Sequence, residues 1–159
     1  MKNRALSVAE FEGVARAYCA WCEGAQGERT DSRAASLLCQ LYAAALALPE
    51  APPENEQGLP DIPPIALDSA RTNLSSFAGR YYREFFDPEP TLDDEPVMGD
   101  IGDDLLDIYK DIRAGLVLYE REEVEEALWH WSFLHRIHWG RHVVGAMFAL
   151  HCLSIGRSE

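Results

Sequence analysis

A segment near the C-terminus becomes apolar on two opposite sides when it is placed on a helix, and this feature constrains the fold most. At 100° per residue, one side of residues 122–156 carries Trp131 and Ala146, and the opposite side carries Phe133 and Phe148. A helix that is apolar on both sides is buried among other helices. The sequence therefore predicts a helical bundle with this segment in its middle.

Four earlier segments also show helical spacing, and none of the chain alternates with the period of a strand. The five expected helices cover residues 7–23, 30–48, 66–86, 100–119 and 122–156. Ser7, followed by Glu10, matches a capping box at the first helix. The last helix would be about 50 Å long if unbroken, and Gly140 or Gly145 is the expected kink.

The connections between these helices are long and acidic. "PEAPPENEQGLPDIPPI" spans the connection 49–65, and "DPEPTLDDEPVMGD" precedes the fourth helix. Proline excludes both from helix interiors and central strands. We predict an all-α fold, in which residues 1–159 form a single-domain antiparallel bundle of about five helices with two long acidic, proline-containing loops.

Charge narrows the choice of partners. The chain has 14 basic and 27 acidic residues, and its formal net charge is −13. Such a surface repels phosphate backbones and anionic lipids, so nucleic-acid and membrane partners are not expected, whereas basic partners or bound cations are tolerated. The N-terminus has no apolar run of signal-peptide length, and no apolar run reaches the roughly 20 residues of a membrane span. We expect a cytoplasmic protein.

Acidic and imidazole side chains follow matching stripes on the last two expected helices. Residues 129–142 contain four of the five histidines, and His135, His138 and His142 share one side. Asp104 and Asp107 lie on the flank of the preceding helix. If the two helices fold back at residues 120–121, Asp107 lies level with His135, Asp104 with His138 and Asp100 with His142. These five residues, Asp104, Asp107, His135, His138 and His142, form the predicted Asp/His seam.

The seam has two interpretations. Carboxylates and imidazoles on facing helices build centres for Zn²⁺, Mn²⁺ or iron, so the seam is a candidate divalent-metal site. Buried histidines also need hydrogen-bond partners, and aspartates can supply them with no metal present. Both interpretations require the same residues.

Three stretches resemble a known family. "YYREFFDP", "GDIGDDLLDIYKDI" and "WHWSFLHRIHWGRHVVGAMFALH", between Tyr81 and His151, are similar to the bacterial domain-of-unknown-function family 5063. The residues that match its motifs are Asp103, Asp104, Asp107, Tyr109 and Asp111, then His138, Trp139, Gly140 and His142. The resemblance implies an all-helical bacterial protein and supplies no activity.

A different arrangement of acids suggests an Mg²⁺ site. Glu122 and Glu125 are three residues apart, as are Glu123 and Glu126, and "DDLLDIYKDI" faintly resembles all-helical nucleotide pyrophosphohydrolases. The order of the two acidic segments is reversed from that pattern. Acids at a helix start also commonly complement the helix dipole.

These observations leave two classes of function open. We favour a non-enzymatic module that binds a protein partner or self-associates, with a structural Asp/His seam. The alternative is a metal-binding protein or metal-dependent bundle enzyme that uses the seam, and a pyrophosphohydrolase-like enzyme ranks below both. No catalytic residue and no cofactor other than a divalent metal is predicted.

Overall fold

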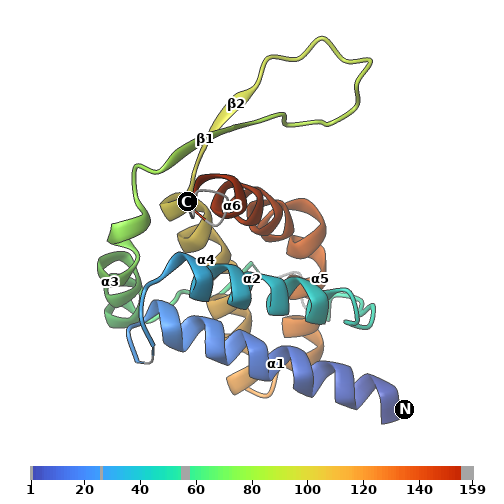
Figure 1. The fold of residues 1–159 in the computed structure, drawn as a ribbon. Coiled ribbons are helices and arrows are strands. Elements are labelled where there is room, and N and C mark those ends of the chain that lie inside the picture. Colours follow the sequence, from blue (N-terminus) through green and yellow to red (C-terminus); the bar gives the residue numbers. More distant parts are fainter. Residues whose placement is uncertain (1, 26, 55–57, 155–159) are drawn as a thin grey trace.

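The structure, a computed structural model, describes residues 2–25, 27–54 and 58–154. Its α-helices are α1 (Lys2–Cys22), α2 (Asp31–Ala45), α3 (Pro64–Asn73), α4 (Ile101–Glu120), α5 (Val124–Ile137) and α6 (Trp139–Leu153). A 3₁₀ turn, η1 (Ser75–Phe77), precedes the strands β1 (Tyr81–Glu84) and β2 (Val97–Asp100). The predicted all-α class is confirmed, since helices build the body of the molecule (Figure 1).

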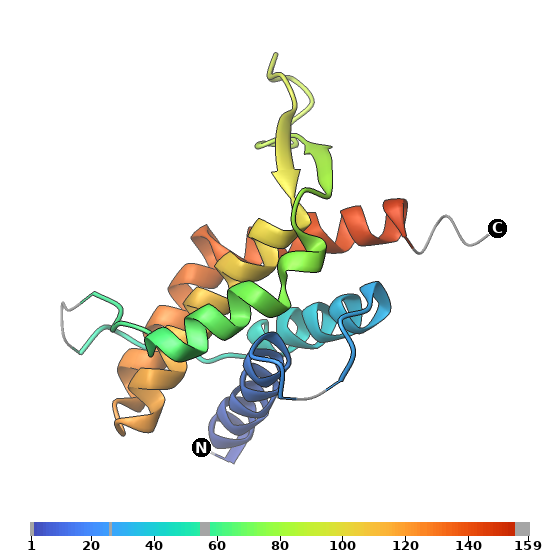
Figure 2. The ribbon, with the colours of Figure 1, turned by 90° about the vertical axis from the view of Figure 1, so that its left-hand side faces the viewer.

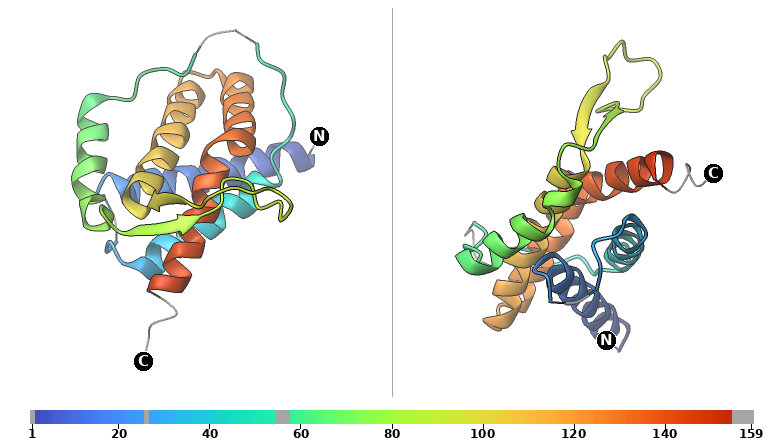
Figure 3. Two further views of the ribbon diagram at one scale, coloured as in Figure 1. Left: turned by 90° about the horizontal axis from the view of Figure 1, so that it is seen from above. Right: turned by 60° about the vertical axis from the view of Figure 1, so that its left-hand side comes forward.

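The core surrounds α4, which packs against α1, α5 and α6. α4 and α5 lie side by side and cross over α1 (Figure 3, left). Trp131 and Trp139 are fully buried, and Phe11 of α1 packs its ring against both. The burial of one side of the last segment agrees with the prediction, but the expected burial of its opposite side is wrong, because Ile137, Val144 and Phe148 are 59%, 49% and 58% exposed.

Helix starts follow from local hydrogen bonds. Thr30 precedes α2, and its hydroxyl accepts a hydrogen bond from the backbone N–H of Arg33, which satisfies an otherwise unpaired donor. α1 begins five residues before the predicted Ser7. The Ser7 hydroxyl donates to the carbonyl of Asn3 inside the helix, so it does not form the expected cap.

The expected helix over residues 66–86 is wrong in its second half. α3 ends at Asn73, and Gly79 then adopts φ = +74°, a left-handed conformation that interrupts a helix. The aromatic residues that follow favour a strand, and β1 pairs antiparallel with β2 in the register Tyr81↔Asp100 to Glu84↔Val97. β1, β2 and the loop 85–96 form an arm that stands away from the helices (Figures 1 and 2).

The expected continuous helix over residues 122–156 is also wrong, because it divides at His138. His138 has φ = −142° and ψ = −86°, and α5 ends before it while α6 begins after it. A Cβ on Gly140 would lie 2.2 Å from the carbonyl oxygen of His135, so only glycine allows this close turn. Gly140 was one of the two expected kinks; residues 155–156 lie outside the described part.

The connection 49–65 contains no helix or strand before Pro64 within its described residues. It packs Ala51, Leu59 and Ile62 partly against the core. Among the described residues, none of the helices combines the length and the apolar character that a membrane span requires.

Candidate metal centre between α4 and α6

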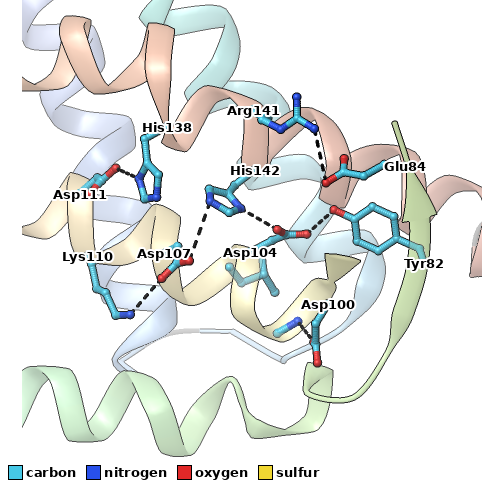
Figure 4. A network of polar contacts seen from close by, with 12 residues as sticks. Tyr82, Glu84, Asp100, Asp104, Asp107, Lys110, Asp111, His138, Arg141 and His142 are labelled. Atoms are coloured by element: carbon cyan, nitrogen blue, oxygen red, sulfur yellow. Dashed lines mark hydrogen bonds and ion pairs between the residues drawn. The ribbon is translucent and has the colours of Figure 1, made fainter. Parts of the chain in front are cut away.

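Two aspartates of α4 are almost fully buried beneath α6. Asp104 is 5% exposed and Asp111 is 8% exposed, whereas Asp103 faces solvent. Burial of a carboxylate is costly unless hydrogen bonds replace its water, so each needs a partner. In both cases one partner is a histidine (Figure 4).

Asp104 connects a histidine with a tyrosine. Its Oδ1 lies 2.7 Å from Nδ1 of His142, and its Oδ2 accepts a 2.6 Å hydrogen bond from the Tyr82 hydroxyl. The bond to Asp104 raises the pKa of His142. Burial, together with the same carboxylate, raises the pKa of Tyr82 far above its usual range, so the phenol stays protonated and donates.

Asp111 plays the matching part for the second histidine. Its Oδ2 lies 2.6 Å from Nδ1 of His138. Burial raises the pKa of Asp111, and the hydrogen bond to His138 opposes that rise. An ionised carboxylate can only accept, so each of these contacts fits a histidine that carries a proton on Nδ1; in a neutral imidazole of that kind Nε2 offers a lone pair.

Asp107 lies between the two imidazoles. Its Oδ2 is 3.8 Å from Nε2 of His142, and the rings of His138 and His142 meet edge to face with centroids 4.8 Å apart. Asp107, His138 and His142 each offer one ligand atom, and these atoms lie within 4.8 Å of one another. Ligand atoms about 2.1 Å from a tetrahedral metal are about 3.4 Å apart, so the three side chains would have to close by up to about 1.4 Å to bind one ion together.

One cation already contacts this group. Nζ of Lys110 lies 2.9 Å from Oδ1 of Asp107, which is one turn earlier on α4. The Lys110 side chain is 41% exposed and the His138 side chain is 44% exposed, so solvent reaches this end of the cluster. We call Asp104, Asp107, Asp111, His138 and His142 the Asp/His cluster.

His135 lies apart from this cluster. Its ring packs against Tyr42 at 4.9 Å and Trp139 at 4.7 Å between centroids, and burial lowers its pKa. One straight helix would have placed His135, His138 and His142 on the same stripe. The break at His138 separates His135 from the other two. Among the described residues, Nε2 of His135 has no hydrogen-bond partner.

The predicted register is also displaced. His142 lies opposite Asp104 in place of Asp100, and Asp111 reaches His138. Asp100 instead caps α4, since its carboxylate accepts from the backbone N–H groups of Gly102 and Gly79. The chain turns later than expected, at residues 121–123, where Glu122 adopts φ = +66°.

The remaining motif residues support the fold. The Tyr109 hydroxyl donates to Glu23 at 2.8 Å, and the Trp139 indole donates to the carbonyl of Trp131 at 3.0 Å. Sequence reasoning missed Tyr82, because the segment around it was expected to be helical, and it missed Lys110. It named Asp111 only as a motif residue.

These features define a mostly helical protein in which aspartates of α4 face histidines at the start of α6. The chain belongs to the family described as Domain of unknown function (DUF5063), whose model matches residues 5–155.

A solved structure shares the fold. The crystal structure of protein BF1032 from Bacteroides fragilis matches with a TM-score of 0.69 and 24% identity, over 92% of this chain and 94% of that chain. No curated protein matches the sequence. The comparisons therefore establish the family and the fold.

Proposed function

We propose that this protein binds a divalent transition-metal ion through Asp107, His138 and His142. The observation that carries the proposal is the pair of carboxylates behind the histidines: Asp104 lies 2.7 Å from Nδ1 of His142, and Asp111 lies 2.6 Å from Nδ1 of His138. Metal-ligating histidines almost always donate their second ring N–H to such a partner, which orients the ring and makes Nε2 more basic.

The charge of the cluster also favours a cation. Three carboxylates, those of Asp104, Asp107 and Asp111, gather around two imidazoles, and Lys110 supplies one positive charge. Two imidazoles with one carboxylate suit zinc, manganese or iron, whereas Ca²⁺ and Mg²⁺ prefer oxygen ligands. Three protein ligands leave at least one position for water, which a bound metal activates for hydrolytic chemistry.

The competing candidate is a partner-binding or self-associating module in which the cluster is structural. Its specific support is the ion pair between Lys110 and Asp107, because the ammonium group of Lys110 neutralises the carboxylate that a metal ion would otherwise bind. The two candidate functions predict different effects of Lys110→Met on metal affinity. Removal of a competing cation strengthens metal binding, whereas in a structural cluster it only leaves Asp107 without its ion pair.

The pyrophosphohydrolase alternative gains no support. Within the described residues, the group of potential ligands is Asp107, His138 and His142, and it contains none of the glutamates 122–126. Glu125 instead pairs with Arg4, and Glu126 is buried beside His130.

The test is elemental analysis followed by Zn²⁺ and Mn²⁺ titration of protein purified without chelator or nickel resin. We expect about one metal per chain, and loss of that metal in His142→Ala and Asp107→Ala. Asp111→Asn should weaken binding by about 10- to 100-fold with unchanged helical circular dichroism, because it disturbs an orienting carboxylate. Asp104→Asn should weaken binding by a similar factor, and it also alters the acceptor of the Tyr82 hydrogen bond.

The matched control is His151→Ala, which removes an exposed histidine from the same helix. It should bind metal as the wild type does. A wild-type protein that takes up neither ion, or uptake that survives His142→Ala, would assign the cluster to a structural role.

A further inference from the structure

Large apolar side chains are exposed mainly around the arm. Within the described residues, eight of the twelve exposed large hydrophobic side chains lie on the arm or on the outer face of α6, so most of the exposed apolar side chains gather in this one region. They are Tyr81, Phe85, Phe86, Leu92, Val97, Met98, Val144 and Phe148. A clustered apolar surface of this kind marks an interaction site, whereas single exposed apolar residues do not.

Part of this surface is a groove between the arm and α6. Phe85 and Leu92 of the arm face Val144 and Phe148 of α6 across a hollow of about 690 Å³. Phe148 is 58% exposed and Val144 is 49% exposed, although both lie on a helix that is otherwise packed in the core. A hollow of this size accepts several side chains of a ligand.

Arg141 holds the arm side of the groove in place. Its guanidinium donates to the carbonyls of Phe85 and Phe86 and lies 4.0 Å from the centre of the Phe86 ring. Figure 4 shows the same side chain directed toward Glu84, at 3.9 Å. The groove is therefore formed before any ligand arrives, which lowers the entropy cost of binding.

The rim of the groove is acidic. Its carboxylates belong to Glu84, Asp87, Glu89 and Asp94, and its two cations are Arg83 and Arg141. Arg141 is already engaged by the arm. An apolar floor with an acidic rim complements a ligand that carries apolar and basic side chains together.

Charge also distinguishes between a foreign partner and a second copy of the chain. Each chain carries a formal net charge of −13, so two copies that meet at this rim would bring acidic surfaces together. Like charges across an interface cost free energy and slow association, whereas a basic partner is steered toward the same rim.

We infer that the groove between the arm and α6 binds a basic segment of a partner protein. The segment places aliphatic or aromatic side chains on Val144 and Phe148, and its lysine or arginine side chains meet Asp87, Glu89 and Asp94. This site goes beyond the proposed metal centre, and its ligand is a peptide, so each can fail without the other.

The test is selection of short peptides from a random displayed library against the full-length wild-type protein. We expect the enriched peptides to combine lysine or arginine with leucine, phenylalanine or tryptophan. Their affinity, measured by fluorescence anisotropy with synthetic labelled peptides, should fall about tenfold in Phe148→Ala, since a truncated central contact costs at least about that much.

Two further variants separate charge from apolar contact. Asp94→Lys should weaken the same peptides and reduce the dependence of their affinity on salt, because it reverses a rim charge. Ile65→Ala is the matched control, since Ile65 is an exposed apolar residue at 82% on a different helix, and it should leave affinity unchanged.

Three outcomes would overturn the inference: no enrichment, enrichment of neutral or acidic peptides, or binding that is equal in wild type and Phe148→Ala. Analytical ultracentrifugation of the wild-type protein without peptide tests for a fourth such outcome. A concentration-dependent dimer that Phe148→Ala dissociates would show that a second copy of the chain occupies the groove.

Discussion

The side chain of one residue, Arg80, connects three parts of the chain. Its guanidinium makes two parallel bonds to the Asp31 carboxylate, at 2.6 and 2.9 Å, and also donates to the Ser154 hydroxyl. These contacts connect the start of α2, the residue before β1 and the end of α6. The hydrogen bond from Arg80 lowers the pKa of Asp31 below its ordinary value.

This lowered pKa predicts how stability changes with acid. A carboxylate whose pKa is lower in the folded state stabilises the fold above its unfolded pKa of about 3.9, and this contribution is lost as pH falls through the folded pKa. Asp31→Asn should therefore cost about 1 kcal/mol in free energy of unfolding at pH 7, and progressively less than that below pH of about 4.

Urea unfolding at neutral and acidic pH measures the difference. Asp68→Asn is the control, because Asp68 is 76% exposed and its pairing with Arg71 is loose at 3.6 Å, so it should cost almost nothing at either pH. If Asp31→Asn lowered the free energy of unfolding equally at both pH values, the charge of Asp31 would not be the source of its stabilising effect.

At the scale of elements, the sequence predicted helices where one face is apolar along the whole segment. α2 and α4 end within three residues of their expected bounds, and the i, i+3 and i+7 spacing of Asp104, Asp107 and Asp111 places them on one side as helix geometry requires. Such features depend on local spacing alone, which is why sequence reasoning recovered them.

The elements that were missed depend on contacts between distant residues. Leu74 and Phe77 are buried as a helical stripe would have them, so local spacing does not reveal that a strand follows. The strand is held by pairing with β2 and by the bond from Tyr82 to Asp104, 22 residues away. The break at His138 differs, because it reflects a close contact between Gly140 and His135, five residues apart, and Gly140 was one of the two expected kinks.

Helix packing at Gly115 gives a test at this scale. A Cβ on Gly115 would lie 2.0 Å from Nε1 of Trp131, whose N–H donates to the carbonyl of Ile112. Gly115→Ala should therefore lower the free energy of unfolding by about 1–3 kcal/mol through overpacking, in spite of the better helix propensity of alanine.

Gly13→Ala is the matched control within α1. A Cβ at Gly13 meets nothing within 4 Å, so this substitution should stabilise the protein by about 0.5–1 kcal/mol. Thermal and urea unfolding of both variants provide the measurement. Equal effects at the two glycines would contradict the close packing of α4 on Trp131.

At the scale of the whole molecule, most of the arm lies outside the core. Tyr82 is the arm residue that enters the core, whereas the loop 85–96 is exposed in all its residues. Replacement of residues 85–96 by Asn-Gly would join Glu84 to Val97, which are already paired, through a two-residue turn. The helical body should keep its circular dichroism.

We expect the free energy of unfolding of this variant to stay within about 1 kcal/mol of wild type, since loop shortening favours folding only modestly. Binding of the basic peptides should be lost, because Phe85, Leu92 and the rim carboxylates Asp87, Glu89 and Asp94 are removed. A large loss of helical content would show instead that the loop is needed to hold the helices together.

The candidate site was recovered in part for the same reason as the fold. Asp104, Asp107, His138 and His142 were predicted together because two neighbouring helices with a short connection must bring their stripes to similar heights. Their exact pairing, the exclusion of His135 and the contribution of Tyr82 depend on a break and a hairpin that local spacing does not encode.

Asp104 is shared between two parts of the molecule, because it accepts one hydrogen bond from His142 and one from Tyr82. An ion on His142 and a peptide along the arm would therefore act on the same carboxylate. Thermodynamic linkage makes such an effect reciprocal: if the ion changes the affinity for the peptide by some factor, the peptide changes the affinity for the ion by the same factor. The two hydrogen bonds of Asp104 are the connection through which such coupling would pass.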